Sequence, residues 1–205
     1  MIIKVCGMRD AQNIREVEAL GIDWIGLVFY PPSPRYVAAK PAYLPVSTPL
    51  VGVFVDADIR QIMQKADDYR LSLIQLHGHE SPQYCNSLRA ALPTVRIIKA
   101  ISVAGIHSVR SAADYEGMVD YLLFDTHCVQ RGGSGRTFDH HLLSHYVGQT
   151  PFLLSGGLSV ADAEDLSRLN HPRLAGYDLN SRFESAPALK DTNLIQQFIN
   201  HLSHQ

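Results

Sequence analysis

The chain has 205 residues, of which 46% are hydrophobic and 19% charged, a composition typical of an ordinary globular protein with a well-buried core. A formal net charge of -2 gives no electrostatic footprint for nucleic acid or anionic lipid, so neither is expected as a partner. The longest apolar run, residues 24–30, is too short to cross a bilayer.

The three cysteines and the N-terminus indicate a cytoplasmic protein. Cys6, Cys85 and Cys128 show neither the paired spacing of a metal site nor the pattern of a disulfide framework. No basic segment with an apolar run and a cleavage site opens the chain. His141 and His145 are one helical turn apart, but no third ligand stands nearby, so no metal is expected.

Eight short apolar segments are typical of strands that are covered on both faces. They span residues 2–6, 24–29, 50–55, 71–76, 95–101, 121–124, 152–154 and 177–179. Helical patterns between them start near Asp10, Asp56, Ser81, Ser159 and Asp191. The proline-rich segment 30–49 leaves room for only a short helix, over 37–43, and segment 102–117 has weak helical character.

This alternation predicts an α/β fold, a single (β/α)8 TIM barrel in which residues 1–205 form one catalytic domain. The competing architecture is an open, doubly wound sheet. The barrel is favoured because residues 6–10, after the first strand, contain one glycine where the dinucleotide-binding fingerprint has three.

Reactive groups in such a barrel stand at the carboxyl ends of the strands. Cys6 ends the first strand and shares a face with Lys4, because strand side chains alternate. Arg35 follows the second strand on a proline-rich loop and could clamp a carboxylate or a phosphate, while His77 follows the fourth strand. Asp125 ends the sixth and is a candidate general acid. The alternatives are a buried structural cysteine, a solvated arginine, a structural histidine and a helix-capping aspartate.

Glycines in the last units suggest a phosphate site. Gly156 and Gly157 follow the seventh strand and precede a capped helix, so their backbone N–H groups can face an anion. Phosphate sites of such barrels lie after strands 7 and 8. The glycine-rich segment 126–137 is either a lid over the mouth or a plain surface loop.

With these residues assembled, the sequence resembles the phosphoribosylanthranilate isomerase family of tryptophan biosynthesis over essentially its whole length. The matching segments are Lys4-Val5-Cys6-Gly7, Ser33-Pro34-Arg35, residues 51–55, residues 75–80, Phe124-Asp125-Thr126, residues 132–135, residues 155–158 and Lys190-Asp191. The resemblance implies an Amadori rearrangement of N-(5-phosphoribosyl)anthranilate, a phosphorylated aminosugar, with no cofactor or metal, by a monomer or a homodimer.

On that family's pattern, Cys6 is the general base and Asp125 the general acid. Arg35 would bind the anthranilate carboxylate, while His77 and Asp178 would line the sugar site. The phosphate site would comprise Gly156, Gly157 and Ser181, together with Arg182. The last two stand where many relatives have a small residue and a glycine, so Arg182 either approaches the phosphate or points outward.

One further hypothesis concerns the base: the Lys4 ammonium would stabilise the Cys6 thiolate from inside the barrel. Two rival functions stay open. An indole-glycerol-phosphate-synthase-like enzyme would need a catalytic lysine at a strand end, whereas Lys4 and Lys99 both lie inside their strands. A non-catalytic phosphate-binding barrel would be expected to have lost Cys6 or Asp125.

Overall fold

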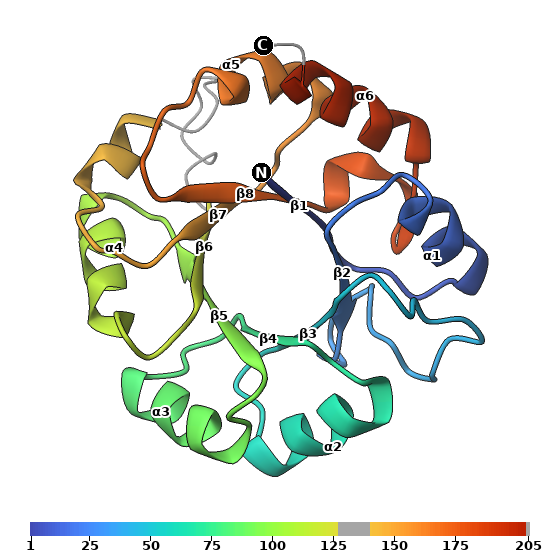
Figure 1. Ribbon diagram of the computed structural model, residues 1–205, viewed down its shortest axis with the longest axis horizontal. Coiled ribbons are helices and arrows are strands. Elements are labelled where there is room, and N and C mark those ends of the chain that lie inside the picture. The colour runs from blue at the N-terminus through green and yellow to red at the C-terminus, as the bar shows by residue number, and fades with distance from the viewer. Residues whose placement is uncertain (127–139, 204–205) are drawn as a thin grey trace.

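The computed structural model describes residues 1–126 and 140–203. Eight strands, each parallel to its neighbours, close into a barrel in chain order, as seen down the ring in Figure 1. They are β1 (Ile2–Val5), β2 (Trp24–Val28), β3 (Leu50–Phe54), β4 (Leu73–Leu76), β5 (Arg96–Ser102), β6 (Tyr121–Asp125), β7 (Phe152–Ser155) and β8 (Leu174–Leu179). The predicted barrel is therefore confirmed, and the pairing of β8 with β1 rules out the open sheet.

Helices surround the ring of strands (Figure 1). The α-helices are α1 (Ala11–Glu18), α2 (Ile59–Tyr69), α3 (Pro82–Ala91), α4 (Ile106–Ser111), α5 (Ala163–Ser167) and α6 (Thr192–Ser203). Short 3-10 helices are η1 (Ala112–Tyr115), η3 (His140–His145), η4 (Val160–Asp162) and η5 (Ser181–Phe183). Within the described ranges, no helix combines the length and the apolar character needed to cross a membrane.

Capping side chains fix where the helices begin. The backbone N–H of Asn13 donates to Asp10, and that of Tyr84 donates to Ser81, as the sequence predicts. The prediction for α2 was wrong by two residues: its cap is Asp58, which accepts from the backbone N–H of Arg60. Asp56 instead has a positive φ of 48° and accepts a hydrogen bond from the backbone of His79.

Two other segments also differ from prediction. Residues 37–43 form no helix, because the segment between β2 and β3 is broken by prolines that cannot donate helical hydrogen bonds. Beyond β8, the chain makes a two-stranded hairpin that the sequence pattern does not indicate, with β9 (Glu184–Ala186) antiparallel to β10 (Leu189–Lys190). This hairpin carries polar side chains to the rim of the barrel.

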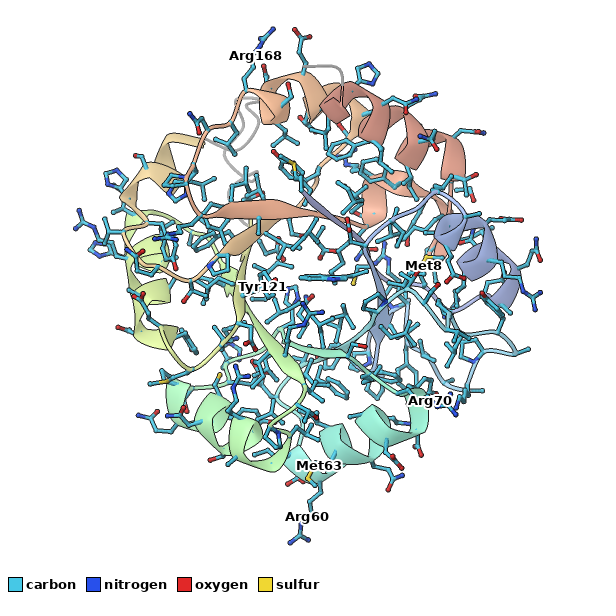
Figure 2. All side chains as sticks on the ribbon, viewed as in Figure 1. Met8, Arg60, Met63, Arg70, Tyr121 and Arg168 are labelled. Atoms are coloured by element: carbon cyan, nitrogen blue, oxygen red, sulfur yellow. The ribbon has the colours of Figure 1, made fainter. Side chains whose placement is uncertain are left out.

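The barrel interior is packed with side chains, so it is a core and not a pore (Figure 2). Trp24 and Tyr121, at the amino ends of β2 and β6, meet edge to face with ring centroids 5.1 Å apart. Above them, Val51, Leu73 and Leu123 belong to the same buried cluster. The amino end of the barrel is thereby sealed, which leaves the carboxyl end as the place where a ligand can enter.

Candidate active site

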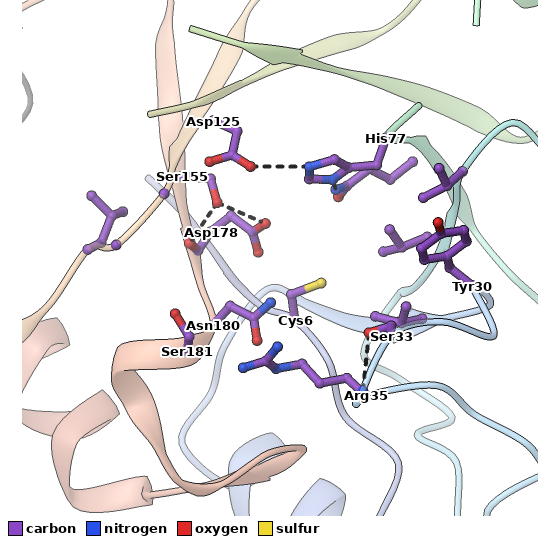
Figure 3. Close-up of a pocket in the computed structure, with 17 residues that line it drawn as sticks. Cys6, Tyr30, Ser33, Arg35, His77, Asp125, Ser155, Asp178, Asn180 and Ser181 are labelled. Carbon is purple, nitrogen blue, oxygen red and sulfur yellow. Dashed lines mark hydrogen bonds and ion pairs between the residues drawn. The ribbon is translucent and has the colours of Figure 1, made fainter. Parts of the chain in front are cut away.

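A cavity of about 440 Å³ lies at the carboxyl ends of the strands (Figure 3). Its volume is in the range of sites that hold small molecules. The predicted site residues that line it are Cys6, Arg35, His77, Asp125, Gly156, Gly157, Asp178 and Ser181. Arg182 is exposed and is not among the residues that line the cavity.

Cys6 projects into this cavity from the residue after β1 (Figure 3). Its backbone N–H donates to the carbonyl of Leu179 at 2.9 Å, which fixes the start of the turn. Space for the thiol comes from β2, because a Cβ at Gly26 would lie only 2.7 Å from the Cys6 Sγ. Gly26 could not be singled out from the sequence, since its role depends on the register between β1 and β2.

Beneath the thiol, Lys4 and Asp178 form an ion pair with 2.8 Å between Nζ and Oδ1, and both side chains are buried. Burial alone would lower the pKa of Lys4, but the charges of Asp178 and Cys6 outweigh it and raise that pKa. Burial raises the pKa of Cys6 above the ordinary thiol value, while the Lys4 charge acts to lower it. Lys4 therefore acts on Cys6 in the hypothesised direction, but it does not overcome the cost of burying a thiolate.

Asp125 ends β6 and enters the cavity beside His77 (Figure 3). Its Oδ2 lies 3.2 Å from the His77 Nε2, and the other ring nitrogen, Nδ1, lies 2.8 Å from the side-chain nitrogen of Gln75. Gln75 lines the same cavity and is 1% exposed. Strand alternation brings Gln75 and His77 to one face, so the three side chains form a row along the wall of the site.

Arg35 reaches the rim of the cavity, where Glu184 of the hairpin holds it by two hydrogen bonds of 2.8 and 2.5 Å. Lys190 also donates to Glu184 and, at 2.8 Å, to the side-chain oxygen of Asn180. Burial alone would raise the pKa of Glu184, but hydrogen bonds from Arg35 and Lys190 outweigh it and lower that pKa. Neither Glu184 nor Lys190 was predicted as a site residue, although Lys190 belongs to a segment that matches the family, because the hairpin that carries them has no strong sequence pattern.

Gly156 and Gly157 follow β7 with positive φ angles of 97° and 74°. Such angles suit glycine, and with no side chain the backbone of this turn is open to a ligand. Thr126, at the end of β6, donates to the carbonyls of Ser155 and Gly156 at 2.9 Å and holds the turn against the barrel. Ser181, after β8, lines the cavity from the neighbouring unit.

Several other expectations concern groups outside this cavity. Among the residues that the structure describes, no group of three or more side chains could hold a metal ion. The synthase-like alternative requires a lysine in the cavity. Lys4 pairs with Asp178, Lys99 pairs with Glu80 at 2.9 Å, and neither lysine is among the residues that line the cavity. The proposed lid over 126–137 lies, apart from Thr126, outside the described residues, as does Cys128.

Comparison with known proteins identifies relatives along the whole chain. A family model described as N-(5′-phosphoribosyl)anthranilate (PRA) isomerase matches residues 3–201. A protein of Phocaeicola vulgatus named N-(5′-phosphoribosyl)anthranilate isomerase is 49% identical over 205 residues, which cover 100% of this chain and 99% of that protein. A protein of the same name from Parabacteroides distasonis is 48% identical over 210 residues, covering 100% of this chain and 94% of the relative.

Solved structures give the same result. Phosphoribosyl anthranilate isomerase from Thermotoga maritima is 30% identical, with a TM-score of 0.84 and full coverage of both chains. A phosphoribosyl anthranilate isomerase in complex with reduced 1-(o-carboxyphenylamino)-1-deoxyribulose 5-phosphate is 27% identical, with a TM-score of 0.82 and again full coverage of both chains. The resemblance seen in the sequence is thus confirmed, and the chain belongs to the N-(5′-phosphoribosyl)anthranilate isomerase family.

Proposed function

We propose that this protein is an enzyme of tryptophan biosynthesis that converts N-(5′-phosphoribosyl)anthranilate into 1-(2-carboxyphenylamino)-1-deoxyribulose 5-phosphate. This is the reaction for which its family is named. The observation that carries the proposal is that Cys6, directly after β1, and Asp125, at the end of β6, line one cavity although their strands are separated by β7 and β8 in the ring. A base and an acid placed in this way can act on a single sugar between them.

The proposed chemistry needs one acid and one base and no redox partner. Asp125 donates a proton to the furanose ring oxygen, the bond from that oxygen to C1 breaks, and an iminium forms at C1. Cys6, as the thiolate, removes the proton from C2, and the electron pair of that bond gives the enolamine. Tautomerisation of the enolamine yields the ketone, so the product is an isomer of the substrate.

The two ends of the substrate would be held by groups of opposite chemistry. The Arg35 guanidinium has five N–H donors. Among the described residues it uses two of them on Glu184, which leaves three for the anthranilate carboxylate. The backbone at Gly156 and Gly157, with Ser181, would bind the phosphate on the other side of the cavity. In this arrangement the ribose would lie beside Cys6 and Asp125, with His77 and Asp178 as the remaining sugar-site residues.

The test is a fluorescence assay of substrate consumption by the wild type, Cys6→Ser and Asp125→Asn. Each substitution removes a proton-transfer group, so each should lower kcat by about 10²- to 10⁴-fold. Binding of the reduced product analogue should change far less, which separates loss of chemistry from loss of the site. Normal turnover by both variants would contradict the mechanism, while a wild type that binds the analogue without turnover would indicate the non-catalytic alternative.

We also propose that the protein acts in the cytoplasm, as one catalytic domain, as a monomer or a homodimer. Among the described residues, Cys6 and Cys85 are buried and form no disulfide, as is typical of proteins in a reducing compartment. A related structure from Thermotoga maritima is described as a monomeric form of a dimeric protein. Sedimentation at several protein concentrations distinguishes the two assemblies.

A further inference from the structure

Gln75 is a polar residue on a strand whose every residue is buried. Its side-chain oxygen, Oε1, is buried and has no hydrogen-bond partner among the described residues. Leaving a buried acceptor without a partner costs about 1–3 kcal/mol. A leucine would fill this position without that cost, so packing alone does not account for the glutamine.

The contact that Gln75 does make sets the proton on His77. A neutral imidazole carries one N–H and one bare nitrogen. The Gln75 amide nitrogen lies 2.8 Å from the His77 Nδ1. An amide N–H can only donate, so with the amide in this orientation Nδ1 of a neutral ring accepts and the ring proton belongs on Nε2. That Nε2–H then points at the Asp125 Oδ2, 3.2 Å away.

The tautomer of His77 decides which oxygen of Asp125 can carry a proton. With hydrogen on Nε2, the Oδ2 of Asp125 accepts a hydrogen bond and the acidic proton belongs on Oδ1. With the amide reversed, Nδ1 would hold the hydrogen and Nε2 would be bare. The carboxyl would then satisfy Nε2 by placing its own proton on Oδ2, directed at His77 and not at a substrate.

We propose that Gln75 is a positioning residue that holds His77 in its Nε2–H tautomer, so that Asp125 carries the proton it delivers on the oxygen that does not face His77. The inference rests on the proposed function, because the contacts from Gln75 through His77 to Asp125 matter only if Asp125 is the general acid. The same His77 N–H also stabilises the carboxylate left after the transfer, so neither partner has to rotate during the reaction.

The experiment compares wild type, Gln75→Glu and Gln75→Met, with Gln196→Met as a matched control. Gln196 donates to the side chain of Asn200 on the exposed side of α6, and it has no other side-chain hydrogen bond among the described residues. The ¹⁵N shifts of the His77 ring report its tautomer without substrate, and His77→Gln identifies the signal. Thermal unfolding of each variant verifies that it is folded, and steady-state kinetics give kcat and KM.

The wild type and the control should show the Nε2–H tautomer. A carboxylate in Gln75→Glu accepts from Nδ1–H, so the ring should become protonated at Nδ1, and Gln75→Met should give a mixture of tautomers. We expect kcat to fall about 10- to 100-fold in Gln75→Glu, with KM changed by less than about threefold. Hydrogen on Nδ1 in the wild type overturns the inference, and so does a wild-type kcat in Gln75→Glu. If the wild-type protein does not turn over the proposed substrate, the proposed function is refuted. The tautomer of His77 is measured without substrate, so that result is separate from the test of the tautomer.

Discussion

Arg35 and Glu184 are 149 positions apart in the chain, yet they form a two-point ion pair at the rim of the cavity. The Arg35 side chain is 19% exposed and the Glu184 side chain 5%, so the pair is sheltered from solvent on the carboxylate side. Hydrogen bonds at two points fix the plane of the guanidinium as well as its position. The arginine is therefore oriented before any ligand arrives, and the hairpin after β8 is what orients it.

Glu184→Gln should weaken substrate binding more than chemistry. The amide cannot pair with both Nε and Nη2 of Arg35 as an anion does, so the guanidinium loses its fixed orientation. We expect KM to rise about tenfold, equivalent to roughly 1.4 kcal/mol of binding, while kcat changes by less than about threefold. The control is Glu164→Gln, which breaks an exposed ion pair with Arg168 far from the cavity and should leave both constants unchanged. Equal effects of the two substitutions would contradict this role for Glu184.

The same substitution should change how stability depends on pH. Because the folded state holds the pKa of Glu184 below its ordinary value of about 4.3, the carboxylate stabilises the fold above that pH. This stabilisation is lost as the pH falls through the lower folded pKa. Urea unfolding should therefore find Glu184→Gln about 3 kcal/mol less stable than wild type at pH 7, with the difference shrinking below about pH 4. A difference that does not vary with pH would argue against an ionic contribution.

The reactivity of Cys6 should depend on two neighbouring charges that shift its pKa in opposite directions, those of Lys4 and Asp178. Because burial raises the pKa of the thiol, alkylation of Cys6 and kcat/KM should both increase with pH above neutrality. Lys4→Met removes the charge that lowers this pKa and should move the alkylation profile to higher pH. Asp178→Asn removes a charge that raises it and should move the profile to lower pH. Alkylation rates measured across pH would exclude this account if both variants shifted in the same direction.

Gly26→Ala tests whether the thiol depends on space provided by the neighbouring strand. The added Cβ would lie 2.7 Å from Sγ and 3.0 Å from the Cys6 Cα, so the thiol and the end of β1 must move from their present positions at the cavity. A displacement of this kind should lower kcat about 100-fold while the protein stays folded. Gly105→Ala is the matched control, since a Cβ there meets nothing within 4 Å and should leave kcat unchanged. Wild-type kcat in Gly26→Ala would show that the thiol has room to spare.

The strand pattern predicted the fold because local rules decide it. Parallel strands buried on both faces give continuous apolar runs, and alternation placed Lys4 and Cys6 together inside the barrel, as found. Predicted element boundaries were wrong where the local sequence signals are ambiguous over a few residues. Asp56 and Asp58 are equally good caps by type, and only Asp58 directly precedes the first helical residue. The start of β8 was placed three residues late, because Ala175 and Gly176 carry little strand propensity.

The site was predictable where it follows from strand ends, and not where it depends on contacts between distant segments. Cys6, His77 and Asp125 stand at or just after strand ends, so the barrel rule alone brings them to one cavity. The partner of Arg35 comes from a hairpin with no apolar alternation, and the space for Cys6 comes from a glycine on the next strand. Both depend on register and loop path, which a single sequence does not encode in any local pattern.

Closure of the ring joins the first strand to the last, and Lys4 finds its charge partner 174 positions later. On a ribosome that adds about 5–20 residues per second, the first strand waits roughly 10 to 35 s for that partner to be made. During this time Lys4 has no charge partner and one edge of β1 is unpaired. An unpaired strand edge can bind chaperones or pair with other unfinished chains. Synthesis of β8 thus closes the ring and supplies Asp178 in one event, so a nascent chain that ends before β8 has neither a closed barrel nor the charge partner of Lys4.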